Sequence, residues 1–257
     1  MRRARNLILA GMLATAAPAF AQDAEATSTD PLPAAAEEAQ RELRQTFTNL
    51  TFEGFGPSPI KGPIYQAIAG GRVIYFAPES GHLLFAAAYD KNGVNVTALA
   101  QDANARKRLD ALDPAQALVL GPAGAPKVIE FTDPDCPYCR ALDRFWATKA
   151  AEGKPVQRYI YFVSGIHPTA AAKAEHILCS PDKKAAFEAM YAGASPAELR
   201  KCAEGARKVA NDADAVRKMG VSGTPTLLVD GKLISGFQQA ELETFLNAKQ
   251  ATADARH

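Results

Sequence analysis

The alternation of apolar and polar positions divides the chain into two folded parts. Between about residues 50 and 97, short apolar runs are separated at even spacing by turn residues, which is typical of an antiparallel meander. Strands are predicted there over residues 64–68, 73–76 and 83–89. Such a small unit buries too little surface to be stable alone, so it is expected to need a partner.

A second pattern begins near residue 125 and has longer elements. The expected elements are, in chain order, a buried strand over residues 127–133, a helix over 140–149, a core strand over 156–163, a long helical stretch over 167–219, strands over 226–229 and 232–234 joined by an Asp-Gly turn, and a final helix. This order predicts an α/β fold with a mixed sheet.

Less regular segments flank and join these parts. Residues 22–46 are expected to be disordered up to about residue 36 and weakly helical after it, because they carry little apolar periodicity. Residues 98–112 form a charged helical pattern with few apolar positions, as in a helix that bridges two domains through solvent. The predicted divisions are a first domain over 47–97, a linker helix and hinge over 98–124, and a second domain over 125–257.

The first 21 residues have the pattern of a secretory signal peptide. Arginines precede a short apolar run, and Ala19-Phe20-Ala21 forms a cleavage site. Removing this segment takes three arginines from a chain with 29 basic and 28 acidic residues, which leaves a slightly acidic protein. Nothing in that balance indicates nucleic acid or an anionic membrane surface as a partner. Export to the periplasm of a Gram-negative cell is therefore expected.

The sequence Cys136-Pro137-Tyr138-Cys139 carries the clearest chemistry. It lies between a predicted strand and a predicted helix, so the positive end of the helix dipole should hold Cys136 partly as thiolate. Cys136 is expected to be the exposed nucleophile, and Cys139, further into the helix, the more buried resolving thiol. A zinc site would need a second pair of ligands, and the sequence has no second motif that supplies one. An inert disulfide bridge at this spacing would add little stability. Redox chemistry without a metal or cofactor is favoured.

Two further cysteines, Cys179 and Cys202, lie in the predicted helical stretch. The 4 cysteines of the chain allow three pairings. In an oxidising compartment a structural disulfide between Cys179 and Cys202 is expected, worth about 3 kcal/mol in the chain-entropy model. The alternative is a pair of free buried thiols.

Two motifs resemble those of a known family. The segment Phe131–Cys139 and the sequence Gly220-Val221-Ser222-Gly223-Thr224-Pro225 look like the active-site segment and the cis-proline loop of thioredoxin-fold proteins. They are more narrowly similar to those of the periplasmic disulfide isomerases DsbC and DsbG. Residues 58–97 resemble the small cystatin-like dimerisation domain of these proteins. The resemblance implies a thioredoxin fold with a helical insertion, preceded by a small α+β dimerisation domain and a linker helix. It also implies a homodimer with two redox sites facing a shared apolar cleft.

Features of both branches of that family occur together. The dipeptide Pro137-Tyr138 and the pair Phe145-Trp146 are similar to DsbG, whereas the cysteines at 179 and 202 resemble the second disulfide of DsbC. A DsbC-like isomerase of misfolded exported proteins is favoured, kept reduced by a membrane electron donor of the DsbD type. The alternatives are a DsbG-like reductase of sulfenylated cysteines with chaperone activity, a DsbA-like oxidase, and a non-enzymatic holdase.

The resemblance also implies roles for individual residues. Thr224, Pro225, Pro137 and Tyr138 are expected to bind substrate, with a cis bond before Pro225 that leaves the Thr224 backbone free to pair with an extended chain. The alternative is a trans proline that opens a strand. Glu130 stands six residues before Cys136, where it either accepts the proton of Cys139 or pairs with Lys127 or a neighbouring lysine.

Overall fold

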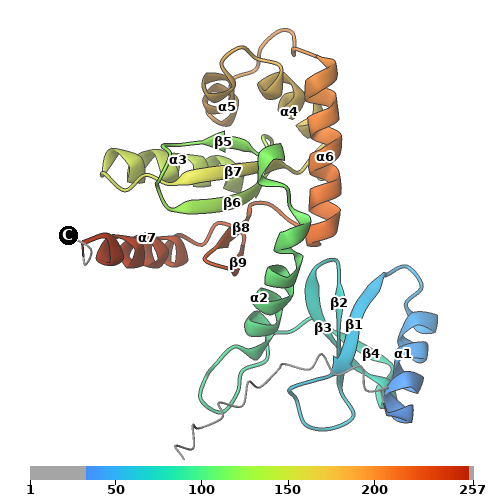
Figure 1. Ribbon diagram of the computed structural model, residues 1–257. Helices are drawn as coiled ribbons and strands as arrows, with labels where there is room; N and C mark the ends of the chain where they lie inside the picture. The colour runs from blue at the N-terminus through green and yellow to red at the C-terminus, as the bar shows by residue number, and fades with distance from the viewer. Residues whose placement is uncertain (1–32, 255–257) are drawn as a thin grey trace, which may run out of the picture. The chain divides into compact units, whose positions relative to one another are not determined.

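The computed structural model describes residues 33–254 of the chain (Figure 1). The predicted signal peptide and the segment that follows it up to residue 32 lie outside the described residues. Within residues 33–254, every helix is too short or too polar to cross a bilayer.

The N-terminal domain is a four-stranded antiparallel sheet with one helix packed on it. The strand order is β1-β2-β3-β4, and the helix is α1. The bounds are Ala34–Thr46 for α1, Phe52–Pro57 for β1, Tyr65–Ala69 for β2, Arg72–Ala77 for β3 and His82–Leu84 for β4. Leu43 of α1 is fully buried against the sheet. The expectation of disorder up to residue 36 is therefore wrong for the first turn of α1.

Strand β1 was not predicted, because two glycines and a proline interrupt its apolar pattern. Its register with β2 shifts between Glu53 and Gly56. The strand expected over residues 83–89 ends at Leu84. Beyond it, Phe85 and Tyr89 are 66% and 64% exposed. The apolar residues of this segment therefore face solvent in the single chain.

Strand β3 is buried on both of its faces. Ile74 and Phe76 pack against α1 and the neighbouring strands, and Tyr75 on the other face shares a 2.5 Å hydrogen bond with Thr97. The apolar run Val73–Phe76 is therefore buried within the single chain. The large apolar side chains of this domain that remain exposed lie at and after β4.

The linker helix α2 spans Val96–Arg108 and is capped by Asn95, whose side chain accepts a hydrogen bond from the Ala98 amide. Although the helix is mostly polar, Asp102 and Ala105 are buried. Asp102 accepts a hydrogen bond of 2.8 Å from the backbone amide of Leu233. The helix is thus more closely packed than a solvent-exposed bridge, contrary to the expectation from its composition.

The larger sheet has the order β5-β7-β6-β8-β9, and only β6 and β7 run parallel. Its strands are Leu118–Leu120 (β5), Lys127–Thr132 (β6), Gln157–Phe162 (β7), Thr226–Val229 (β8) and Lys232–Ser235 (β9). The mixed sheet predicted from the sequence is confirmed. Strand β5, which falls in the expected hinge, is too short to show a period in the sequence.

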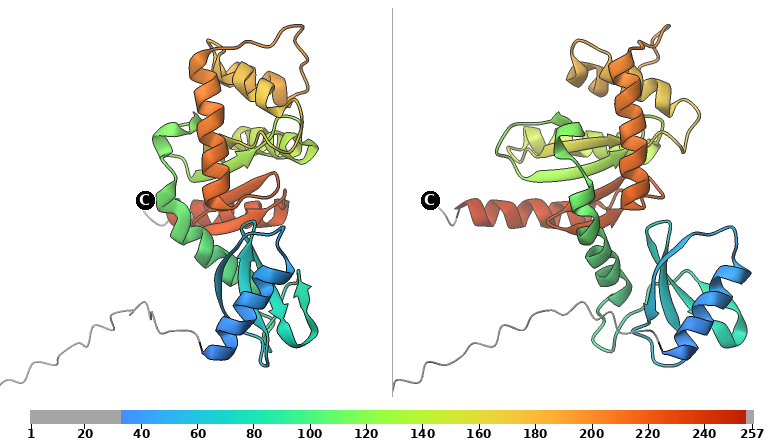
Figure 2. Two further views of the ribbon diagram at one scale, coloured as in Figure 1. Left: turned by 90° about the vertical axis from the view of Figure 1, so that its right-hand side faces the viewer. Right: turned by 45° about the vertical axis from the view of Figure 1, so that its right-hand side comes forward.

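Helices cover the two faces of this sheet unequally (Figures 1 and 2). Helix α3, Pro137–Ala151, and helix α7, Gln239–Asp254, pack on the face that carries Val128 and Leu227. The opposite face, which carries Phe131 and Tyr161, is covered by the end of α6 and by residues that follow α2. Because side chains alternate along a strand, residues 128, 130 and 132 all point to the α3 face.

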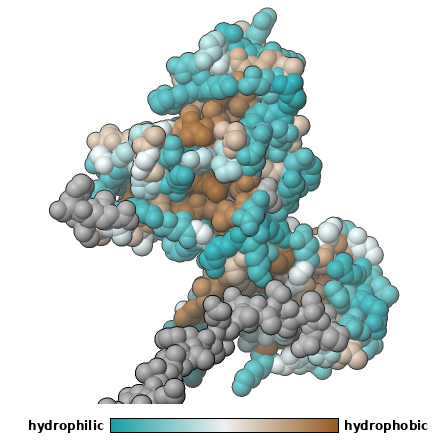
Figure 3. All heavy atoms as spheres, in the orientation of Figure 1, coloured by the Kyte–Doolittle hydropathy of each residue, from teal (hydrophilic) through white to brown (hydrophobic). Residues whose placement is uncertain are grey.

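Part of the opposite face remains open. Figure 3 shows apolar side chains gathered in the middle of the domain on the side turned to the viewer in Figure 1. Ile129, Tyr159 and Leu228 line a hollow of about 370 Å³ there. Ile129 and Tyr159 come from the two parallel strands, so this hollow lies on the sheet itself.

The stretch from residue 167 to 219, expected to be one long helical region, contains three separate helices. These are α4 (Ala170–Leu178), α5 (Lys183–Tyr191) and α6 (Ala203–Met219). Pro181 follows α4, and Asp182 caps α5 by accepting a 2.9 Å hydrogen bond from the Ala185 amide. Proline and a capping aspartate are the local reasons for the break.

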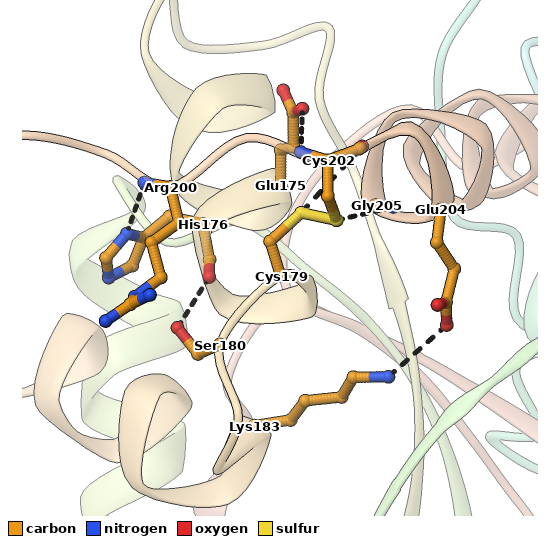
Figure 4. Close-up of a disulfide and its surroundings, with 9 residues drawn as sticks. All are labelled: Glu175, His176, Cys179, Ser180, Lys183, Arg200, Cys202, Glu204 and Gly205. Carbon is orange, nitrogen blue, oxygen red and sulfur yellow. Dashed lines mark hydrogen bonds and ion pairs between the residues drawn. A yellow bond between two sulfur atoms is a disulfide. The ribbon is translucent and has the colours of Figure 1, made fainter.

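Cys179 and Cys202 form a disulfide, the pairing expected from the sequence (Figure 4). Cys179 is the C-cap of α4 and Cys202 the N-cap of α6, so the bond joins the two helices where they end and begin. Gly205 packs directly against both sulfurs, where a β-carbon would clash with Cys179. The bond and the glycine together hold α4 against α6.

Replacing both Cys179 and Cys202 by alanine should lower the free energy of unfolding by about 3 kcal/mol, because the bond closes a loop of 23 residues in sequence separation. Chemical denaturation of the variant and of the wild-type protein measures this difference. The reduction potential of the Cys136–Cys139 pair should stay unchanged in the same variant. An unchanged free energy of unfolding would contradict a stabilising role for the bond.

Candidate functional site

The two cysteines of the C-x-x-C sequence lie where β6 gives way to α3. Cys136 is the N-cap of the helix, Pro137 occupies its first turn, and Cys139 follows one turn in. The helix begins at residue 137 rather than at the predicted 140, because a proline at the first position suits a helix start. Both thiols are free in the structure.

The cysteines differ little in exposure. Cys136 is 4% exposed and Cys139 is fully buried, so the expectation of an exposed Cys136 is wrong for the unliganded chain. The Cys136 thiol donates a hydrogen bond of 3.4 Å to the Thr224 carbonyl. Burial raises the pKa of the Cys139 thiol, while hydrogen bonds from the Thr132 side chain and the Asp133 backbone act against that rise. The Cys139 thiol is therefore difficult to deprotonate.

The loop before β8 closes over Cys136. The Thr224–Pro225 peptide bond is cis, so the alternative of a trans proline is wrong. The Pro225 carbonyl accepts a hydrogen bond of 2.7 Å from the Gly236 amide. Tyr138 is 65% exposed and lines a cleft together with Thr224 and Phe237. The residues expected to bind substrate thus lie together beside the redox pair.

Polar contacts fix the loop that precedes Cys136. The buried Asp133 carboxylate accepts a hydrogen bond of 2.8 Å from the Asp135 amide and lies 2.8 Å from Nδ1 of His167. The Asp135 carboxylate accepts a hydrogen bond from Thr169 and forms an ion pair with Lys173. Although partial burial acts to raise it, these two contacts hold the pKa of Asp135 below its ordinary value. The loop is therefore anchored to the helical insertion.

Glu130 is fully buried and paired with an arginine. Both of its carboxylate oxygens accept hydrogen bonds of 2.9 Å from Arg158, which also donates to Asp143 at 2.6 Å. The pairing of Glu130 with Lys127 or another lysine is therefore wrong. Burial acts to lower the pKa of Arg158, but the two carboxylates outweigh it and raise that pKa. Burial raises the pKa of Asp143.

Sequence reasoning missed several of these side chains. Arg158 could have been identified from the sequence, because it shares the inward face of a predicted core strand with Ile160 and Phe162. A charge on that face would be costly without a partner, so a buried ion pair could have been expected. Thr132 lies two residues after Glu130 and so on the same face. Tyr191, whose hydroxyl donates to Thr132 at 2.9 Å, lies in the helical insertion and offered no signal.

Comparison with known proteins accounts for nearly the whole chain. Residues 20–98 match the family described as disulfide bond isomerase protein N-terminal domain, and residues 114–250 match the thioredoxin-like domain family. The chain is 29% identical over 215 residues to the thiol:disulfide interchange protein DsbC of Escherichia coli K12, covering 81% of this chain and 87% of that protein. It is 26% identical over 239 residues to DsbG of Pseudomonas aeruginosa, covering 88% and 89%.

A solved structure shares the fold. A linker-deletion mutant of ScsC from Proteus mirabilis superposes with a TM-score of 0.51 at 20% identity, covering 59% of this chain and 84% of that one. The predicted fold class is confirmed by these comparisons: a four-stranded antiparallel domain precedes a thioredoxin-like α/β domain with a helical insertion.

Arg158→Met should lower the free energy of unfolding by about 3–5 kcal/mol, because it leaves the Glu130 carboxylate buried without a partner. The double variant Glu130→Gln/Arg158→Met should recover a large part of that loss. Lys184→Met, which removes the exposed pair with Glu188, is the control and should leave the stability nearly unchanged. Equal effects of Arg158→Met and Lys184→Met would show that the buried pair matters no more than the exposed one.

Proposed function

This chain belongs to the DsbC and DsbG family of thiol:disulfide interchange proteins, and we propose that it isomerises or reduces wrong disulfides in exported proteins. One observation carries the proposal. A pair of free thiols, Cys136 and Cys139, stands at the start of a helix beside a cis-proline loop, in a chain that also matches the N-terminal domain of disulfide isomerases. Isomerisation needs such a pair in its reduced form.

Cys136 acts as the nucleophile in this proposal. It sits at the N-terminus of α3, where the helix dipole favours a negative charge. Its thiolate attacks a substrate disulfide, forms a mixed disulfide and releases one substrate thiolate. A second substrate thiol then displaces Cys136 in isomerisation, whereas Cys139 displaces the substrate in reduction. The order follows from position, because Cys136 is the N-cap of α3 whereas Cys139 lies within the helix.

The substrate chain lies in the cleft beside Cys136. Thr224 and the cis Pro225 present backbone to an extended chain, and the exposed Tyr138 bounds the cleft on the α3 side, next to Pro137 in the sequence. The carbonyl of Thr224 now accepts a hydrogen bond from the Cys136 thiol. A substrate chain that pairs with Thr224 therefore replaces the hydrogen bond between the Cys136 thiol and the Thr224 carbonyl.

Glu130 has a supporting role in this proposal. Both of its oxygens are engaged by Arg158, which leaves neither free to receive a proton from Cys139 without loss of a charged hydrogen bond. The Glu130 side chain instead holds Arg158 beneath the first turns of α3, where Asp143 of that helix completes the ion pair.

The compartment and the assembly complete the proposal. The leader over residues 1–21 and the disulfide between Cys179 and Cys202 support a periplasmic location. The match to the N-terminal domain of disulfide isomerases supports a homodimer, with the exposed edge at β4, including Leu84 and Phe85, as the contact. A membrane electron donor of the DsbD type keeps the pair reduced.

A second candidate is reduction of sulfenylated single cysteines. The Pro137-Tyr138 dipeptide and the 26% identity to a DsbG support it. Both candidates use Cys136 as the attacking thiol, and they differ in the substrate. Reactivation of a scrambled ribonuclease, compared with oxidation of its reduced form and with reduction of a sulfenylated single-cysteine protein, separates isomerase, oxidase and sulfenic-acid reductase.

Cys136→Ser should abolish reactivation of scrambled ribonuclease, because it removes the attacking thiol of the proposed mechanism. Cys139→Ser should instead accumulate a covalent adduct with substrate, since the resolving thiol is absent. Non-reducing gel electrophoresis detects the adduct, and the wild-type protein is the control. Adducts with Cys136→Ser and none with Cys139→Ser would reverse the assignment. Rapid oxidation of reduced ribonuclease without reactivation of the scrambled form would favour the oxidase.

Phe85→Asp should convert the mature dimer into a monomer at micromolar concentration, because it places a charge on the apolar segment after β4. Sedimentation analysis of the mature protein measures the mass. Leu99→Asp is the control, because Leu99 is also exposed, at 54%, but lies on α2. A monomeric wild-type protein would contradict the dimer, and a dimeric Phe85→Asp variant would place the contact elsewhere.

A further inference from the structure

Two aspartates in the loop that precedes the redox pair are held by side chains from a distant segment of the chain. The Asp133 carboxylate lies 2.8 Å from Nδ1 of His167, in the turn between β7 and α4. The Asp135 carboxylate accepts a hydrogen bond of 2.6 Å from Thr169 and pairs with Lys173 of α4. One short stretch, residues 167–173, therefore holds both aspartates.

Asp133 determines how the chain enters α3. Its carbonyl accepts a hydrogen bond of 3.1 Å from the Cys136 amide, and its carboxylate accepts one of 2.8 Å from the Asp135 amide. These two bonds close a tight turn that ends at Cys136, the N-cap of the helix. Within residues 33–254, the Cys136 side chain makes no capping bond to α3. The position of its sulfur at the helix end therefore depends on this turn.

The carboxylate of Asp133 is fully buried, whereas the side chain of His167 is 37% exposed. A buried carboxylate is costly unless hydrogen-bond donors engage it. In the part of the chain that the structure describes, the donors to Asp133 are the Asp135 amide and the His167 ring. An ionised carboxylate only accepts hydrogen bonds, so Nδ1 of His167 carries the hydrogen of this contact. The ring is a donor at Nδ1 in its neutral and in its charged form alike.

The backbone of His167 is itself held in place. Pro168 follows it, and a residue before proline is restricted in its backbone conformations. The His167 carbonyl accepts a hydrogen bond of 3.2 Å from the amide of Ala170, the first residue of α4. Ala170 and Ala174 of that helix are fully buried. The imidazole ring is therefore attached to a packed helix start and holds Asp133 from there.

We propose that His167 is a positioning residue for the redox pair, acting through Asp133 on the backbone of Cys136. The hydrogen bond at Nδ1 holds the Asp133 side chain, and the Asp133 carbonyl holds the Cys136 amide at the start of α3. Cys136 thus stays where the positive end of the helix dipole stabilises its thiolate. The inference rests on the proposed function only in that the Cys136–Cys139 pair cycles between dithiol and disulfide.

The reduced form of the pair gains from this arrangement. A thiolate at the helix N-terminus is stabilised there, whereas a disulfide carries no charge at that position. In equilibrium with glutathione, two glutathione thiols give two electrons and two protons to the Cys136–Cys139 disulfide and become one glutathione disulfide. The protein gains two thiols, of which Cys136 then ionises. Stabilising this reduced form makes the protein disulfide easier to reduce, so loss of the His167 contact should favour the disulfide.

Other contacts hold the middle of the same loop without His167. Nε of Arg140, on α3, donates a hydrogen bond of 2.9 Å to the Pro134 carbonyl, and its guanidinium lies 3.8 Å from the Asp135 carboxylate. Lys173 pairs with Asp135 from the other side. A variant of His167 keeps all of these contacts. It should therefore remain folded and lose only the hold on Asp133.

The test is the equilibrium of the pair with glutathione at a fixed pH, measured from the fractions of oxidised and reduced protein. His167→Leu should lower the equilibrium constant for reduction about fivefold, because the thiolate is less well placed at the helix end. His167→Asn should restore most of the wild-type value, since the amide nitrogen of Asn lies close to the position of Nδ1. His167→Gln, whose amide nitrogen lies closer to the position of Nε2, should not. Chemical denaturation shows whether each variant is folded.

His176→Leu is the matched control. Nδ1 of His176 also makes a hydrogen bond, of 2.9 Å, in the same helical insertion, but its partner is the Arg200 amide (Figure 4). The equilibrium constant of this variant should equal that of the wild-type protein. A His167→Leu value equal to that of the control would overturn the proposal, as would equal values for His167→Asn and His167→Leu.

A second pair of variants tests the route through Asp133. In an Asp133→Ala background, His167→Leu should cause no further change in the equilibrium constant, because the contact is already absent. A further fivefold fall would show that His167 does not act through Asp133. Because glutathione is the probe, failure of the isomerase proposal leaves this test intact.

Discussion

The burial of Cys139 is the constraint around which the second domain is arranged. The sulfur has no exposed surface, yet the proposed exchange reaction requires it to carry a negative charge. A low-dielectric site makes that charge costly, and it also strengthens every hydrogen bond that points at the sulfur. The face of the sheet beneath α3 is accordingly polar at residues 130, 132 and 158, where a structural sheet would carry aliphatic side chains.

The same constraint explains why two layers of polar contacts surround the pair. Near the sulfur, the Thr132 side chain and the Asp133 backbone act against the rise in the pKa of Cys139, and the cis Thr224–Pro225 loop contacts Cys136 through the Thr224 carbonyl. Farther away, Arg158 is held between two carboxylates and touches the ring on which Tyr191 stacks.

The sequence predicted the parts of the fold that depend on local pattern. The C-x-x-C at a strand-to-helix junction, the mixed sheet and the pairing of Cys179 with Cys202 all follow from spacing, period and turn residues. Short or interrupted elements such as β5 were missed, because three residues show no period. The partner of Glu130 and the position of Tyr191 depend on contacts 28 and 59 residues away along the chain, which a single sequence does not display.

The disulfide between Cys179 and Cys202 has a consequence for the biogenesis of the protein. It fastens the insertion that carries Tyr191, so the environment of the redox pair is complete only after this bond has formed. The four cysteines of the chain can form six different single disulfides, of which one, Cys179–Cys202, leaves the C-x-x-C reduced and the insertion closed. In the proposed function, a protein that corrects the disulfides of others therefore itself needs an oxidant to form its structural disulfide.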